Sequence, residues 1–239
     1  MIDAVLFDWG HTLMDWVWDE RLLEAGIRTG LEAAGAPAVK AHEVTHRYRN
    51  EVRLTDWEVP EEVEYEGLVR EMLADVGVSV DDAQLERYLV AEHAVWAPAR
   101  RLAPMSHALL DSLRDHGLKT GLVSNAMDPG WLLRRDLDEQ GLAGRLDSIV
   151  FSSEVGVRKP HPRIFQRALD ELEVEPARAL FVGDRLKQDV RGARDMGMRT
   201  VLALWFRVED DVDEAEPDFR AFTHMDVLNV VRRLTRLGR

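Results

Sequence analysis

The stretch AVLFDWGHTLMD, residues 4–15, decides the fold. It begins with an apolar run, reaches Asp8 and then breaks into a Gly-His-Thr turn. A continuous apolar run is typical of a strand that is buried on both faces of a parallel sheet. A carboxylate at the end of such a strand is costly to bury unless it caps, binds or attacks something. We therefore interpret Asp8 as a candidate functional residue.

The composition is that of a globular protein with an excess of acidic groups. Hydrophobic residues make up 46% of the 239 residues, and the formal net charge is −13. This charge argues against a nucleic-acid or anionic-membrane surface, because both need clustered Lys and Arg. A small anionic substrate would need only a few local cations.

Cysteines and long apolar segments are both lacking in the sequence. Without cysteine, disulfides, thiolate metal sites and a cysteine nucleophile are excluded. No apolar run approaches the roughly 18 residues of a membrane span, and the start does not read as a signal peptide. We therefore expect a cytoplasmic protein.

Apolar runs rich in β-branched residues predict strands, and segments with helical periodicity separate the later ones. One such segment, 162–172, places its apolar residues on one face. Strand, helix and strand in succession predict an α/β fold with a Rossmann-like parallel sheet. The predicted strands are 4–8, 119–124, 147–151, 178–183 and 199–204.

About 110 residues separate the first two predicted strands, which is far more than one crossover helix needs. Helical periodicity between roughly 17 and 97 predicts about four helices, most clearly over 19–35, 60–77 and 81–96. Further helices are expected at 105–117 and, closing the chain, at 225–239. The predicted domains are a hydrolase core, 1–15 and 99–239, and a helical cap, 16–98.

Polar residues follow four of the predicted strands. Asp8 ends the first strand, Ser124 and Asn125 follow the second, Lys159 lies a few residues beyond the third, and Asp184 follows the fourth. The carboxyl ends of parallel strands meet at one edge of the sheet, where such folds bind ligands. Two carboxylates, a hydroxyl and an amine at this edge suit a divalent cation and an anionic substrate.

Four segments, in order along the chain, resemble the motifs of the haloacid dehalogenase-like hydrolase superfamily. The helical insert matches the cap of that superfamily in position, and the similarity covers roughly residues 4 to 204. The segments are FDWGHTL (7–13), LVSNA (122–126), GVRKPHPRIF (156–165) and FVGDRLKQDVRGARDMGM (181–198).

The resemblance implies that Asp8 is a nucleophile that forms a covalent aspartyl intermediate. Lys159 would hold Asp8 and the substrate anion by charge, and Ser124 would donate a hydrogen bond to a phosphoryl oxygen. Asn125 would join Ser124 and Lys159 in binding the substrate.

The resemblance also implies a magnesium site. Asp8, Asp184 and the backbone carbonyl of Gly10 would be its ligands, with Asp189 supporting them. A Mg²⁺ ion there would reduce the repulsion between an anionic nucleophile and an anionic phosphate.

The sequence departs from the superfamily pattern at Gly10. Phosphatases that the chain resembles have an aspartate at this position, which protonates the leaving alcohol and then activates water. Loss of a general acid and base removes a factor of about 10²–10⁴ in rate. The neighbouring His11 replaces the usual glycine, and we expect it to point away from the site. Trp16 and Trp18 are expected to pack at the start of the cap or to line an apolar substrate pocket.

Several functions stay open. The leading one is a magnesium-dependent hydrolase that acts on a phosphate ester or related phosphoryl compound. A 2-haloacid dehalogenase-like enzyme needs no acid at Gly10, although GDRLKQD (183–189) keeps the magnesium pattern. A phosphonatase-like enzyme would need a cap lysine, and the sole one is Lys40, beside GAPAV. The remaining alternative is a catalytically weak regulatory protein that binds a phosphorylated ligand.

Overall fold

The computed structural model describes residues 1–51, 59–206 and 213–236. Within these ranges it contains a six-stranded sheet in the order β5-β4-β1-β6-β7-β8, with every pairing parallel. The predicted α/β fold is therefore confirmed, and all five predicted strands are present. The strands are β1 (Ala4–Phe7), β4 (Lys119–Ser124), β5 (Ser148–Phe151), β6 (Ala179–Gly183), β7 (Arg199–Ala203) and β8 (Phe219–Ala221).

Strand β1 lies in the middle of the sheet and shows why its sequence is continuously apolar. Val5 and Phe7 belong to the hydrophobic cluster on one face, and Ala4 and Leu6 belong to the cluster on the other. All four side chains are fully buried. Successive side chains of a strand point to opposite faces, so a strand covered on both sides needs an unbroken apolar run.

The strand register brings the predicted polar residues to one edge. Phe7 is level with Leu122 of β4 and with Val182 of β6. The Asp8 amide continues this pattern by donating to the Val182 carbonyl at 2.9 Å. The residues that follow β1, β4 and β6 therefore leave the sheet side by side.

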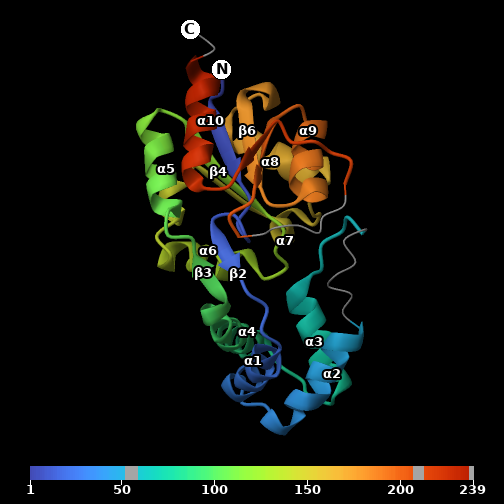
Figure 1. Ribbon diagram of the computed structural model, residues 1–239. Coiled ribbons are helices and arrows are strands. Elements are labelled where there is room, and N and C mark those ends of the chain that lie inside the picture. The colour runs from blue at the N-terminus through green and yellow to red at the C-terminus, as the bar shows by residue number, and fades with distance from the viewer. Residues whose placement is uncertain (52–58, 207–212, 237–239) are drawn as a thin grey trace.

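Helices cover both faces of the sheet (Figure 1). Helices α5 (Ser106–Asp115), α6 (Gly130–Glu139) and α10 (His224–Arg236) contribute to the cluster that contains Phe7. Helices α8 (Pro162–Leu172) and α9 (Gly192–Asp195) contribute to the cluster that contains Leu6. The predicted helix 225–239 is thus present as α10, and residues 237–239 lie outside the described residues.

The long insert is helical, as predicted, and it has a hydrophobic cluster largely its own. Figure 1 shows its helices below the carboxyl edge of the sheet. Two of the four begin at an aspartate that caps backbone N–H groups, Asp19 for α1 and Asp81 for α4. The helices are α1 (Glu20–Ala33), α2 (Ala41–Glu51), α3 (Tyr65–Asp75) and α4 (Asp82–Val95).

Two features of the insert differ from the sequence prediction. The predicted helix 60–77 begins only at Tyr65, because the preceding residues bond to the core: the Glu62 amide donates to the Gly156 carbonyl at 3.1 Å. Strands β2 (Met14–Trp16) and β3 (Arg100–Leu102) form an antiparallel ribbon that was not predicted. Strand β2 spans the proposed domain limit at 15/16, and β3 begins just after the limit at 98/99; both limits stay a proposal.

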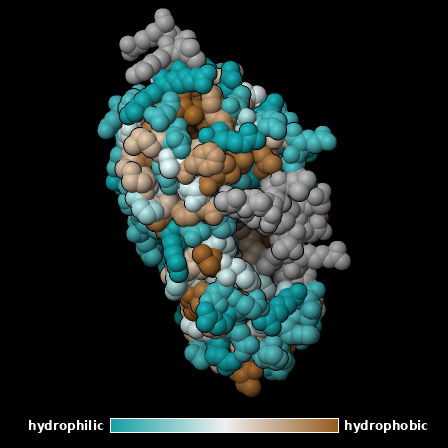
Figure 2. Space-filling model, in the orientation of Figure 1, coloured by the Kyte–Doolittle hydropathy of each residue, from teal (hydrophilic) through white to brown (hydrophobic). Residues whose placement is uncertain are grey.

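The described helices are all too short or too polar to cross a membrane. On the face drawn in Figure 2, hydrophilic residues dominate over the helical insert, and the surface is hollowed where the insert meets the core. This hollow lies at the edge of the sheet where the predicted site residues emerge.

Candidate active site

Lys159 is the centre of the site. Its Nζ lies 2.6 Å from Asp8 Oδ1 and 2.7 Å from Asp189 Oδ1. The side chains of Lys159 and Asp189 are each 2% exposed, and that of Asp8 is 10% exposed. Charge-assisted hydrogen bonds between buried groups are short and strong, so the ammonium holds the two carboxylates in fixed positions.

Asn125 fixes the backbone that carries Lys159. Its Oδ1 accepts from the Lys159 amide at 2.7 Å, and its Nδ2 donates to the Lys159 carbonyl at 3.1 Å. Asn125 also lines the cavity next to Ser124. The oxygen and the nitrogen of the Asn125 side chain thus both bond to the backbone of the loop that carries Lys159. A role for Asn125 in substrate binding stays a prediction.

Asp189 lies in a wide turn of π-helical type, Leu186–Arg191, directly after β6. Its second carboxylate oxygen, Oδ2, accepts from the Arg185 amide at 2.9 Å. Gly183 makes room for this side chain, because a Cβ at Gly183 would lie 2.4 Å from Asp189 Cγ. Only glycine at residue 183 is compatible with this close approach.

Three buried carboxylates meet at this edge of the sheet. Asp8, Asp184 and Asp189 each place an oxygen within 4.8 Å of the others. The pKa of Asp8 is raised to about 7: burial is the largest cause, Lys159 acts to lower the pKa, and the charges of Asp189 and Asp184 act to raise it. Carboxylate oxygens at this spacing fit a hard divalent cation such as Mg²⁺. The part of Gly10 and Asp189 in such a site stays a prediction.

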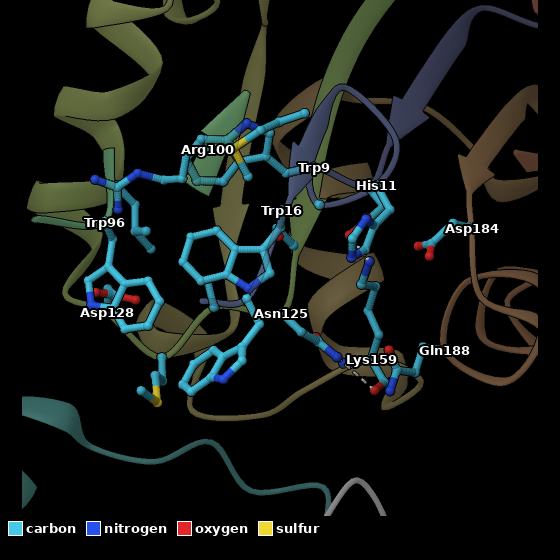
Figure 3. Close-up of a pocket in the computed structure, with 18 of the residues that line it drawn as sticks. Trp9, His11, Trp16, Trp96, Arg100, Asn125, Asp128, Lys159, Asp184 and Gln188 are labelled. Carbon is cyan, nitrogen blue, oxygen red and sulfur yellow. Dashed lines mark hydrogen bonds and ion pairs between the residues drawn. The ribbon is translucent and has the colours of Figure 1, made fainter. Parts of the chain in front are cut away.

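His11 differs from its predicted placement. We expected it to point away, but it lines the cavity, and Figure 3 shows its ring on the side of Lys159 and Asp184. Its backbone is left-handed, with φ of 56°, a conformation that a glycine adopts more readily. Its Nδ1 lies 3.3 Å from Asp15 Oδ1.

The cavity extends from Asp8 into the helical insert, with a volume of about 370 Å³. Tryptophan side chains form much of its far wall: the ring centroid of Trp96 lies 5.5 Å from that of Trp16 and 4.9 Å from that of Trp18. The sequence indicated Trp16 and Trp18. It did not indicate Trp96, which comes from the end of the insert and reaches them only in the folded chain.

A charged cluster that the sequence did not reveal joins the insert to the core. His93 of α4 lies 2.9 Å from Asp128 Oδ1 through Nδ1 and 2.9 Å from Asp136 Oδ2 through Nε2. Arg100 Nε lies 3.2 Å from the same Asp136 oxygen. Burial alone would lower the pKa of His93, but the two carboxylates outweigh it and raise the pKa from 6.5 to about 9.

Lys40 is the one predicted candidate that the structure leaves outside the site. Its Nζ pairs with Glu43 at 2.9 Å on the surface of the insert, and it is not among the residues that line the cavity. The other candidates, Asp8, Gly10, Ser124, Asn125, Lys159, Asp184 and Asp189, all line one cavity.

The fold and this edge of the sheet define a class of hydrolase, and comparison with known proteins agrees. A family model described as haloacid dehalogenase-like hydrolase matches residues 2–197. The chain belongs to this family of enzymes.

Related proteins include enzymes that are named phosphatases. A glyceraldehyde 3-phosphate phosphatase of Methanopyrus kandleri is 31% identical over 99% of this chain and 100% of its own. A phosphoserine phosphatase of Thermus thermophilus is 34% identical over 82% of this chain and 76% of its own. A 2-haloacid dehalogenase structure from Pseudomonas syringae has a TM-score of 0.70 over 98% of this chain and 100% of its own, at 23% identity, which supports the fold alone.

The raised pKa of His93 predicts that stability depends on pH. Protonated His93 stabilises the folded chain fully below pH 6.5, and this contribution disappears as the pH rises to about 9. We expect the Tm of the wild type to fall between pH 6.5 and about 9. We expect His93→Gln to have a lower Tm than the wild type at pH 6.5 and a smaller fall in Tm over the same range. The measurement is Tm against pH, with His116→Gln, at an exposed position, as the control. Equal pH dependence in the wild type and His93→Gln would contradict the assignment.

Proposed function

We propose that this hydrolase is a magnesium-dependent phosphatase of small phosphate monoesters that acts through an aspartyl phosphate on Asp8. The observation that carries the proposal is the buried Asp8 carboxylate, held at 2.6 Å by Lys159 beside two further carboxylates. Two relatives that match most of this chain and are named phosphatases support it. The helices between residues 16 and 98 act in this proposal as a cap that encloses the substrate.

The proposed reaction has two steps. An Asp8 oxygen attacks phosphorus, the bond from phosphorus to the ester oxygen breaks, and the ester oxygen leaves as the alcohol after taking a proton from water, since Gly10 supplies none. Water then attacks the aspartyl phosphate and releases inorganic phosphate, which regenerates Asp8. Lys159 holds Asp8 in position and offsets the charge of the phosphoryl group, while Ser124 donates a hydrogen bond to a phosphoryl oxygen.

Asp8 and Asp184 are the proposed metal ligands, together with the Gly10 carbonyl and the support of Asp189. Bound Mg²⁺ would supply positive charge where a dianionic phosphate approaches a carboxylate. The grouping of the three carboxylates supports this site, since the charges of Asp184 and Asp189 raise the pKa of Asp8 and a bound cation would offset that repulsion.

Asp8→Asn tests the covalent step. An amide cannot attack phosphorus, so we expect hydrolysis of nitrophenyl phosphate in the presence of Mg²⁺ to fall by on the order of 10³-fold or more. Mass spectrometry of the acid-quenched wild type should show one added phosphoryl group, and the variant should show none. Asp115→Asn, at an exposed position on α5, serves as the control. Retained activity in Asp8→Asn would exclude the mechanism. A wild type that binds phosphate esters without hydrolysing them would favour the regulatory alternative.

Asp184→Ala tests the metal site. Removing one of three carboxylates leaves too few anionic oxygens for a hard cation, so we expect the affinity for Mg²⁺ to fall at least about tenfold. Isothermal titration calorimetry with MgCl₂ measures this, and Asp195→Ala, an exposed aspartate on α9, is the matched control. Unchanged affinity in Asp184→Ala would place the metal elsewhere.

Gly10→Asp tests the missing acid and base. A Cβ at Gly10 meets no atom within 4 Å, so the structure has room for the new side chain. We expect faster hydrolysis of alkyl phosphates, which have poor leaving groups, by less than the roughly 10²–10⁴ that a well-placed acid supplies. Nitrophenyl phosphate, whose leaving group needs less protonation, should gain less. A folded variant with no gain, or with equal gains on both substrates, would contradict this explanation of Gly10.

A further inference from the structure

Glu92 is a buried carboxylate at the far end of the cavity, away from the proposed chemistry. It lies on α4 and is only 4% exposed. Its Oε1 accepts a hydrogen bond from Trp96 Nε1 at 2.9 Å. Among the residues that the structure describes, no cation pairs with Glu92 and no second donor reaches it. Glu92 nevertheless lines the same cavity as Asp8.

Among the described residues, the charged groups near Glu92 form ion pairs with one another and none with Glu92 itself. His93 bonds to Asp128 and Asp136, and Arg100 pairs with Asp136. This cluster contains two cations and two carboxylates. Burial, together with the charge of Asp128, raises the pKa of Glu92 to about 7, although the hydrogen bond from Trp96 and the charges of His93 and Arg100 act to lower it. A buried carboxylate without a cation is costly, and a bound cation removes that cost.

Helix α1 is shaped to hold Glu92 at the cavity wall. Gly26 of α1 lies against it, and a Cβ at Gly26 would approach Glu92 Oε1 to 3.3 Å. The carboxylate is therefore confined between α1 and Trp96. A carboxylate that is already confined loses little conformational entropy when it binds a ligand group.

Aromatic side chains surround the same end of the cavity. Rings attract a cation through their electron-rich faces, and tryptophan does so most strongly. The indoles pack against one another, which favours a compact head group over a flat heterocycle inserted between them. Besides Trp9, which follows Asp8, the aromatic residues that line the cavity are Trp16, Trp18, Tyr48, Tyr65 and Trp96.

The two ends of the cavity are distinct in Figure 3. Trp16, Trp96 and Arg100 lie on one side, and Lys159 and Asp184 lie on the other. A cavity of about 370 Å³ accommodates a small molecule that reaches both ends. One end offers the Lys159 amine and the Ser124 hydroxyl for a phosphoryl group. The other end offers Glu92 within aromatic walls, and the cations there, His93 and Arg100, are paired with other carboxylates.

We propose that Glu92 and the surrounding aromatic side chains bind an organic ammonium group, so that the substrate is a phosphate monoester whose other end carries a cationic amine. The inference rests on the proposed phosphatase function and names its substrate class. Glu92 is then a specificity-determining residue, since it contacts the part of the substrate that does not react.

Matched pairs of esters test the proposal with the full chain and Mg²⁺. Choline phosphate is compared with its uncharged isostere 3,3-dimethylbutyl phosphate, and ethanolamine phosphate with propyl phosphate. We expect kcat/KM to be at least about tenfold higher for the ammonium ester of at least one pair. The same kcat/KM for both members of each pair, or a preference for adenosine 5′-monophosphate over all of them, would overturn the proposal.

Glu92→Gln separates charge recognition from a structural role. Glutamine keeps the size of the side chain and an oxygen for Trp96, so the proposal expects the ammonium preference to fall to about twofold or less. A purely structural role would lower kcat/KM for both members of a pair alike and would overturn the proposal. Glu86→Gln, an exposed position on the same helix, is the matched control and should keep the wild-type preference.

The experiments distinguish failure of the proposed phosphatase function from failure of the proposed ammonium site. If the wild type hydrolyses no ester, including nitrophenyl phosphate, the proposed function fails, and calorimetry with choline phosphate and 3,3-dimethylbutyl phosphate tests the ammonium site directly. Tighter binding of choline phosphate, weakened about tenfold in Glu92→Gln, would support the site. Equal binding of the two compounds would overturn it.

Discussion

The ion pairs of Lys159 with Asp8 and Asp189 are the contacts on which the rest of the site depends. Their N–O distances are 2.6 and 2.7 Å. Two carboxylates buried so close together would repel each other, and each would be costly to remove from water. The ammonium of Lys159 offsets both the repulsion and the cost of burial. It also connects Asp8, after β1, and Asp189, after β6, to the loop beyond β5. Asn125, which follows β4, holds that loop by its backbone, so four strand ends share one network.

Charged contacts also hold the helical insert on the core, next to the residues that bear the proposed function. Glu62 of the insert pairs with the buried Arg158 at 2.7 Å, and Arg158 immediately precedes Lys159. On the other side of the cavity, His93 joins α4 to Asp128 and Asp136 and immediately follows Glu92. Breaking a buried ion pair leaves an uncompensated charge. The position of the insert on the core and the geometry of both cavity ends are therefore energetically linked.

The sheet was largely predictable because burial on both faces imposes a simple pattern. Runs such as AVLF mark strands whatever the surrounding fold, since every side chain meets one apolar layer or the other. The strands β2, β3 and β8 were not predicted, because three residues of mixed exposure carry no such pattern. The helix predicted from residue 60 was too long at its start. Helical periodicity carries no information about the hydrogen bonds between residues 60–62 and the loop of Arg158.

The sequence by itself determined which groups meet at the edge of the sheet. Asp8, Ser124 and Asp184 each directly follow or end a strand, and parallel pairing in register brings such residues together without further information. Tertiary structure alone decided the far wall of the cavity. Glu92 and Trp96 are ordinary residues of an amphipathic segment, and whether they face solvent, core or cavity depends on how α1 and α4 pack. The raised pKa of Asp8 has the same origin, since burial and neighbouring charges exist only in the folded chain.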